Sequence, residues 1–348
     1  MKRKIPLLLI ISVIVSFSFV ACRPAPAETI VETVVVNTVE TVVVTQEPVE
    51  EPAEETQPEC CRPYRIGMFG EPISLNYWNY FGPGFFVWGK HILGDDAAHL
   101  FDLSARRYDF VPALATDIPT PDENQDGTWS IVVDMVDDAR WSDGEPIDAE
   151  DVAFTHQVCK EFQLTGYWES VCYPGGVDVT VEALDDFTVE YVYRDQAPSL
   201  KTWQFGLALA PILPEHFWAD VVDEAYEAIQ VDRPEQERPQ DCDAAEADEE
   251  LCAAWDGYDQ ALTEAREVLY NADAFDQPVA GAYVTTEWEP GESILRTSNE
   301  NYYFKGAEIV EYEDGTWMRT MPDGSELQLY GKAEGEEMLR YTLGPHNP

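Results

Sequence analysis

The sequence predicts an α/β protein, because a strand pattern and a helix pattern follow each other closely in its central part. Residues 129–136 alternate apolar and polar side chains, which is typical of a half-buried strand. A turn at 142–144 then leads into an expected helix over 148–162. Its apolar residues fall at helical spacing: Val152, Phe154, Val158 and Phe162. Asp148 stands at the N-cap and Asp151 follows three residues later, as in a capping box, so this unit is expected to be a scaffold and not a catalytic element.

The chain begins with a leader of the secretory type over residues 1–21. Basic residues near the start precede an apolar run that ends at a small residue, Ala21, directly before Cys22. This run is typical of a signal peptide and is too short for a membrane span. Ala21-Cys22 resembles a bacterial lipobox, so Cys22 is expected to carry a lipid and to become the mature N-terminus. An ordinary signal peptide with an incidental cysteine is the alternative.

Residues 22–61 are rich in Val, Thr, Glu and Pro and are expected to form a disordered tether. The hexapeptide VETVVV occurs at 31–36 and again at 39–44, where it has strand propensity but no evident partner. Prolines set among glutamates follow, and the like charges of such a linker repel one another and extend it. The tether is thus predicted to separate a lipid anchor from a folded region that begins near residue 62.

The formal net charge is −46, from 67 acidic and 21 basic residues. Nucleic acid and anionic bilayers would be repelled by this charge, so both are excluded as favoured partners. Acidic residues are dense in an expected insertion over 221–272, in which 234–251 contains prolines and 258–269 has a helical apolar face. A charge run of this kind is expected to form a solvated surface.

Six cysteines follow Cys22, and an even number in an exported protein favours disulfides over metal binding. Two pairs are close in sequence: Cys159 with Cys172, and Cys242 with Cys252. The first would join a helix end to the loop after it, and the second would close the acidic insertion. Cys60 and Cys61 are adjacent and receive no pairing. Free buried thiols are the alternative for some of these residues.

Catalytic motifs are not found in the sequence. It contains no GxSxG, no HExxH, no Walker loop and no GxGxxG at a strand–helix junction. The five histidines are scattered, and surface or capping roles are expected for His91 and His99 in preference to metal ligation. A non-enzymatic protein is therefore predicted.

One segment has the spacing of a metal loop. Residues 122–128, DENQDGT, match D-x-[DN]-x-[DN]-G, with oxygen ligands at alternate positions and a glycine for the tight turn. The candidate calcium ligands are Asp122, Asn124, Asp126 and Thr128. Val133 stands at the twelfth position, where a bidentate acid is usual in such loops. A structural calcium ion and a plain polar turn are the two interpretations, and no other cofactor is expected.

The segment WSDGEPIDAEDVAF, residues 141–154, resembles the signature region of the family 5 extracellular solute-binding proteins of ABC transporters, the peptide- and nickel-binding group. A segment at 65–67 is similar to the family's first strand. Further matches occur in the family's order: PISLN (72–76), ALDDFTV (183–189), ILPEHFW (212–218), PVAGAY (278–283) and NENYYFKG (299–306). The resemblance covers residues 65–306.

The resemblance implies a periplasmic-binding-protein type II-like fold, with mainly the first lobe present and the second largely absent. Residues 62–306 would form the N-terminal part of the family domain, and 307–348 the start of the second lobe or a truncated tail. It also implies a lipid-anchored component of an ABC importer at the outer face of the cytoplasmic membrane or in the periplasm. This component would bind a peptide-like solute, or a nickel chelate, and deliver it to permease subunits. A lobe-only adhesive or sensory envelope protein that does not transport is the alternative.

Two aromatic stretches, 77–88 and 166–168, correspond to regions that lie near the ligand in the resembled family. Glycines interrupt the first stretch, so several of its rings must stand on a loop. Rings provide contact area without demanding one particular side chain, which suits a broad-specificity pocket. The expected ligand-binding residues are Tyr80, Phe85, Trp88, Tyr167 and Trp168. Placement of these rings in the core is the alternative.

Overall fold

The computed structural model describes residues 63–344, apart from 95, 174–175, 195–196, 199–202, 204–208, 243 and 245–246. The expected signal peptide, the tether, Cys22, Cys60 and Cys61 lie outside the described residues. Within the described ranges, no helix has both the length and the apolar character needed to cross a membrane.

A four-stranded antiparallel sheet contains the strand that the alternating pattern predicted. Its order is β3-β4-β6-β5, with bounds β3 Asp122–Glu123, β4 Trp129–Asp134, β5 Val179–Asp185 and β6 Thr188–Tyr193. In β4, Ile131 and Val133 are buried while Val132 and Asp134 are exposed, as period-two alternation requires. The strand ends at Asp134, two residues earlier than expected.

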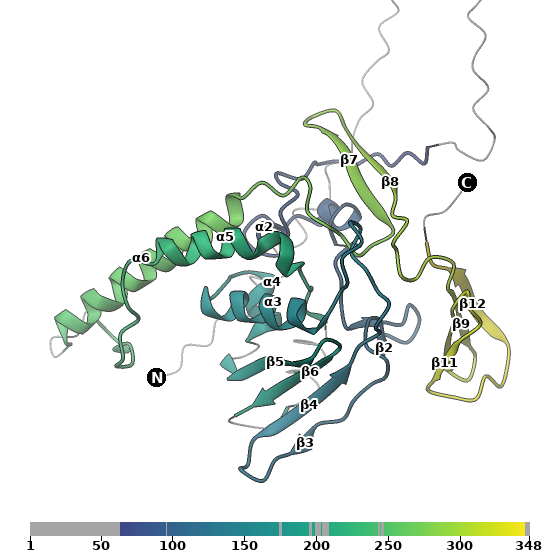
Figure 1. The fold of residues 1–348 in the computed structure, drawn as a ribbon, viewed down its shortest axis with the longest axis horizontal. Coiled ribbons are helices and arrows are strands. Elements are labelled where there is room, and N and C mark those ends of the chain that lie inside the picture. Colours follow the sequence, from purple (N-terminus) through teal and green to yellow (C-terminus); the bar gives the residue numbers. More distant parts are fainter. Residues whose placement is uncertain are drawn as a thin grey trace, which may run out of the picture. The chain divides into compact units, whose positions relative to one another are not determined.

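The helix predicted after the 142–144 turn is α3 (Ala149–Glu161), which packs against β5 (Figure 1). Its capping box is complete. The Asp148 side chain accepts hydrogen bonds from the Glu150 and Asp151 amides, and the Asp151 side chain accepts one from the Asp148 amide. A disulfide between Cys159 of α3 and Cys172 joins this helix to the end of α4 (Tyr167–Cys172).

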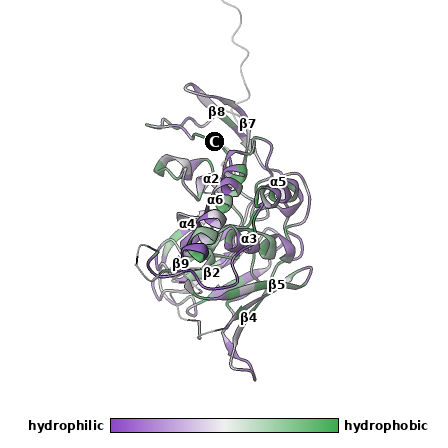
Figure 2. Ribbon diagram, turned by 90° about the vertical axis from the view of Figure 1, so that its left-hand side faces the viewer, coloured by the Kyte–Doolittle hydropathy of each residue, from purple (hydrophilic) through white to green (hydrophobic). Residues whose placement is uncertain are grey.

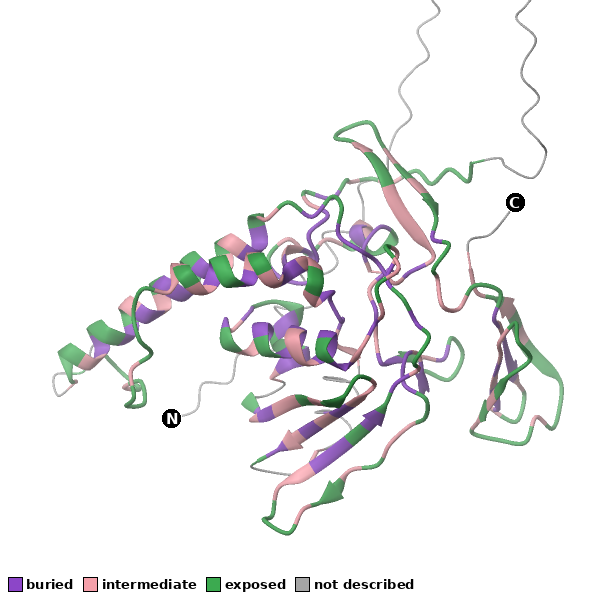
Figure 3. Ribbon diagram, viewed as in Figure 1, coloured by how far each residue is buried: buried purple, intermediate pink, exposed green. Residues whose placement is uncertain are grey.

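Two long helices, α5 (Glu215–Ala228) and α6 (Glu249–Asn271), pack against each other in the acidic region. α6 contains the helix expected at 258–269 and begins earlier, where Asp248 caps the first turn. Polar and apolar residues share α6 (Figure 2), and its first turns and the preceding loop are largely exposed (Figure 3). A disulfide between Cys242 and Cys252 ties that loop to the start of α6.

Two clusters of buried side chains hold these elements together. The first is centred on Trp78 of α2 (Tyr77–Tyr80), whose ring centroid lies 5.0 Å from that of Trp168 and 6.1 Å from that of Trp218. The second lies between α3 and the β3–β6 sheet and includes Ile131 and Trp141. Both clusters contain several large aromatic side chains, each of which buries a large apolar area.

Three further β units complete the described chain, and all their pairs are antiparallel. Two are two-stranded: β1 (Phe101–Leu103) with β2 (Phe110–Pro112), and β7 (Tyr283–Glu289) with β8 (Ser293–Ser298). The third is a four-stranded sheet in the order β11-β10-β9-β12, with bounds β9 Glu308–Tyr312, β10 Trp317–Thr320, β11 Glu326–Leu329 and β12 Glu337–Thr342. Residues 308–342, expected to be a tail or the start of a second lobe, therefore form a sheet of their own.

The expected first strand at 65–67 is not formed. Tyr64 and Ile66 are 86% and 59% exposed, and no strand of the described chain pairs with this segment. A strand needs hydrogen bonds to a neighbour, so strand-type residues alone do not produce one.

Candidate functional site

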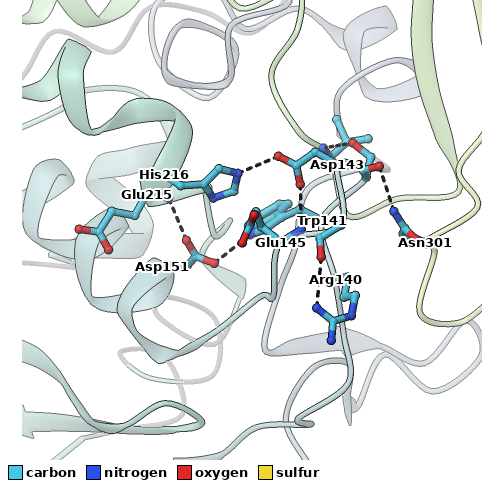
Figure 4. Close-up of polar contacts among 11 residues, drawn as sticks. Arg140, Trp141, Asp143, Glu145, Asp151, Glu215, His216 and Asn301 are labelled. Carbon is cyan, nitrogen blue, oxygen red and sulfur yellow. Dashed lines mark hydrogen bonds and ion pairs between the residues drawn. The ribbon is translucent and has the colours of Figure 1, made fainter.

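Two segments that are distant in the sequence meet at the 142–144 turn (Figure 4). The Asp143 carboxylate lies 2.8 Å from Nε2 of His216, at the start of α5. Asn301 donates its side-chain amide to the Ser142 carbonyl at 3.0 Å. Arg140 donates to the Gly144 carbonyl at 3.1 Å. The signature motif thus joins α5 to the segment that precedes β9.

Asp151 is the buried centre of the same network. Its carboxylate accepts hydrogen bonds from Trp141 Nε1 at 2.8 Å, from the Glu215 amide at 2.8 Å and from the Asp148 amide at 3.3 Å. Burial raises the pKa of Asp151 to about 6, although the N–H donors of Glu215 and Trp141 lower it. Each donor belongs to the scaffold, so the carboxylate joins α3, α5 and Trp141 and is closed to a solute.

Two of the five expected ligand-binding rings are core residues, which corrects the expectation that they face a solute. Trp168 is 0% exposed and donates its indole N–H to the Trp78 carbonyl at 3.0 Å. Tyr80 is 4% exposed and lies in the same cluster. Trp168 packs on Trp78, and Tyr80 packs on Phe81 and Phe85, so both rings fill space in the core.

The other three expected rings reach the surface. Phe85 is 60% exposed, Tyr167 is 37% exposed, and Trp88 is half-buried. Trp88 belongs to the short 3₁₀ helix η2 (Val87–His91). Each ring packs on a neighbour: Phe85 on Tyr80, Trp88 on Phe69, and Tyr167 on Phe81. A small exposed aromatic surface therefore remains, and its role in ligand binding stays a prediction.

The loop expected to bind calcium is a hairpin turn between β3 and β4 that its own side chains close. Asp126 Oδ1 accepts hydrogen bonds from the Thr128 amide at 3.0 Å and the Thr128 hydroxyl at 2.7 Å. Asn124 donates to the same hydroxyl at 2.9 Å. In the part of the chain that the structure describes, no group of three or more His, Cys, Asp or Glu side chains is arranged to hold a metal. Calcium binding therefore stays a prediction.

A cavity of about 370 Å³ lies between β2 and the face of the β9–β12 sheet, and sequence reasoning missed it. Five aromatic side chains line it: Tyr302, Tyr303, Phe304, Trp317 and Tyr341. Four polar side chains also line it: Lys90, His99, Asp102 and Arg319. A volume of this size, lined by several rings together with aliphatic residues and a few polar groups, is typical of a small-solute site. The one available signal was the aromatic run at 302–304, because the other walls come from distant parts of the chain.

Burial controls the electrostatics of this cavity. It lowers the pKa of His99, while the nearby Asp102 carboxylate acts in the opposite direction, so the imidazole is held neutral. Burial raises the pKa of Tyr302 to about 12, and the Asp102 charge adds to this effect. The phenol of Tyr302 is therefore a neutral donor or acceptor at physiological pH.

Comparison with known proteins identifies the scaffold. Residues 109–326, more than half of the chain, match the family model described as bacterial extracellular solute-binding proteins, family 5, middle region. The chain belongs to this family. The resemblance of the 141–154 motif is thereby confirmed, as is the α/β, periplasmic-binding-protein type II-like fold class that it implied.

The individual proteins that resemble this family 5 chain share a low sequence identity with it. The periplasmic alpha-galactoside-binding protein of Rhizobium meliloti (strain 1021) is 27% identical over 155 residues, which cover 39% of this chain and 20% of the relative. The oligopeptide binding protein from Thermus thermophilus, solved with a pentapeptide, is 20% identical with a TM-score of 0.42, covering 70% of this chain and 36% of that one. The periplasmic binding protein MelB from Agrobacterium fabrum, solved with stachyose, is 18% identical with a TM-score of 0.41, covering 66% and 30%. The chain thus spans 20% to 36% of the length of these relatives.

Proposed function

We propose that the chain is the substrate-binding component of an ABC importer, which captures a peptide-like solute outside the cytoplasmic membrane and delivers it to a membrane permease. The observation that carries this proposal is the family match over residues 109–326. A lipid on Cys22 would hold the protein at the outer face of the membrane. The cavity beside β2 supports the proposal, because it combines aromatic contact area with a few polar groups.

An oligosaccharide is the second candidate solute. It is favoured by the 27% identity to an alpha-galactoside-binding protein over 155 residues. Rings such as those of Trp317 and Tyr302 can stack on the apolar faces of sugar rings as well as on peptide side chains. A nickel chelate has less support, because the described chain presents no cluster of metal-binding side chains.

Calorimetry on the full chain tests solute binding. We expect weak binding, millimolar at best, from a pool of di- to pentapeptides, because high affinity in a two-lobed receptor requires both lobes to close over the solute. We expect melibiose, an alpha-galactoside, to bind less tightly or not at all. Tighter binding of melibiose would support the second candidate. If neither solute binds at about 10 mM, the proposed function is wrong. Trp317→Leu, in the cavity wall, should weaken binding, whereas Phe69→Leu, a ring 93% exposed, should not.

Fractionation and uptake test the anchor and the partner. Cys22→Ser should release the protein from membranes and abolish its labelling by a radiolabelled fatty acid. Deleting the gene should reduce peptide uptake by cells. Normal uptake in the deletion strain, with the protein still at the envelope of the parent strain, would favour the alternative of a non-transporting adhesive or sensory protein.

A further inference from the structure

Arg319 of β10 is a buried cation in the cavity wall. Its residue is 7% exposed, and its side chain lies on the face of the sheet that packs over β2. The guanidinium donates one hydrogen bond, from Nη1 to the Pro112 carbonyl at 2.7 Å. It also lies over the rings of Phe304 and Trp317, 5.0 Å and 5.8 Å from their centroids. The guanidinium is thus held in one orientation between the sheet and β2.

Across the described residues, no carboxylate lies within ion-pair distance of Arg319. Two other arginines of the described chain do have carboxylate partners. Arg296 pairs with the buried Asp96, and Arg340 of β12 pairs with Glu308 and Glu337. A guanidinium carries five N–H donors, and only one from Arg319 has a protein partner in the described chain. A buried charge without a counter-ion is costly, so a ligand that supplies one would be favoured.

The other charged groups near this cavity do not neutralise Arg319. Asp102 lines the cavity but lies beyond ion-pair distance from Arg319, and Lys90 adds a second positive charge. Glu311 is 1% exposed on the same face of the sheet, and it accepts its hydrogen bond from the Arg106 amide at 3.2 Å. Burial lowers the pKa of Arg319, and Tyr303 acts in the opposite direction. The guanidinium nevertheless remains charged at physiological pH.

We propose that Arg319 binds the carboxylate of the solute, and that the cavity takes a small organic acid with an apolar or aromatic body, including the C-terminal end of a short peptide. The inference rests on the proposed function only in treating the cavity as a place where solute is held. A planar guanidinium forms charge-assisted, two-pronged hydrogen bonds with a carboxylate. The five rings of the wall would enclose the apolar body. A neutral sugar would leave the charge of Arg319 without a counter-ion.

The test compares two probes that differ only in charge, 3-phenylpropionate and its amide, by calorimetry on the full chain. We expect the acid to bind and the amide to bind at least about tenfold more weakly, since a hydrogen bond to a charged group is stronger than a neutral one. Arg319→Gln should lose binding of the acid. Arg340→Gln, which removes an exposed charge from the same sheet, should retain it. This result would support the assignment.

Equal binding of acid and amide, or no binding of the acid, would overturn the assignment, and neither measurement needs a variant. Undiminished acid binding by a folded Arg319→Gln protein would also overturn it, because Arg319 would then serve only to join the sheet to β2. Amidated peptides or melibiose that bind while the acid does not would leave the proposed function standing and remove only the role of Arg319. The two failures are therefore distinguishable.

Discussion

Two of the regions in which the described chain buries charged side chains differ in how fully those charges are partnered. Around the signature motif, Asp151 accepts three hydrogen bonds from Trp141, Asp148 and Glu215. On the inner face of the β9–β12 sheet, Arg319 uses one of its donors, and Oε2 of Glu311 has no hydrogen-bond partner among the described residues. The Asp151 carboxylate is thus enclosed by its protein partners, whereas the Arg319 guanidinium borders a cavity.

This difference separates a scaffold from a binding surface. A buried polar group with all its partners inside the protein fixes the relative positions of the elements that supply them. A buried polar group left open beside a cavity is exceptional and calls for an explanation, of which an external ligand is the simplest. The signature motif is therefore expected to control stability, and the cavity to control binding.

The largest expected effect is on the scaffold. Trp141 is 1% exposed, and its indole donates to Asp151 at 2.8 Å. Trp141→Ala should lower the free energy of unfolding by about 3–5 kcal/mol, because it leaves a cavity and removes a donor from a buried carboxylate. Phe69→Ala, at a ring 93% exposed, should change it by less than about 0.5 kcal/mol. Urea denaturation measures both, and a Trp141→Ala protein as stable as the parent would refute the scaffold role.

The second-largest expected effect is a pH dependence of the free energy of unfolding, and it arises from His156 on α3. Its Nε2 lies 3.0 Å from the Cys172 carbonyl, and burial lowers its pKa to about 4. Because this pKa lies below the unfolded value of about 6.5, the unfolded chain binds the proton more readily. The stability contributed by neutral His156 is therefore present above pH ~6.5. It should be lost as the pH falls toward 4, by up to about 3 kcal/mol.

Ionisation of Asp151 changes the stability with pH in the opposite direction to His156, so variants at the two positions should have opposite pH profiles. Its folded pKa of about 6 lies above the unfolded value, so its contribution is largest at low pH and is lost as the pH rises through 6. In the parent, the contributions of Asp151 and His156 should therefore largely cancel each other between pH 4 and 7. Asp151→Asn should reveal the loss on acidification, and His156→Gln should reveal the gain. A His156→Gln profile identical to that of the parent would contradict the assignment.

A smaller effect is expected at the start of α3. Asp148 accepts hydrogen bonds from the amides of Glu150 and Asp151, which have no helical partner. Asp148→Ala should cost about 1 kcal/mol, and Asp148→Asn should cost much less, because asparagine caps equally well. Equal losses in the two variants, measured by thermal unfolding, would show that the charge matters more than the cap.

The difference between the scaffold and the cavity also explains which features could be predicted from the sequence. The capping box, the alternation of β4 and the helix at 258–269 depend on neighbouring residues, so local patterns were sufficient. The burial of Trp168 depends on contacts with Trp78, 90 residues away along the chain, and composition does not reveal it. The cavity was missed for the same reason, since Arg319 meets the Pro112 carbonyl across 207 residues. Local chemistry thus predicted the scaffold, and long-range packing created the candidate site.

The smallest expected effect is at the 122–128 turn, where calcium was expected from the spacing of oxygen ligands. Asp126 and Asp122 are on the outside of the hairpin and can face a cation, but Oδ1 of Asp126 already accepts two hydrogen bonds from Thr128. A calcium ion must compete with those bonds, so binding should be millimolar at best.

Calcium at a concentration equal to its Kd would add about 0.4 kcal/mol to the free energy of unfolding. Asp126→Ala should remove that increment, whereas Asp134→Ala, at the exposed end of β4, should keep it. Melting curves that do not change when calcium is replaced by EDTA would leave the segment as a hairpin turn. Its acidic residues would then serve the solvated surface, apart from both the scaffold and the cavity.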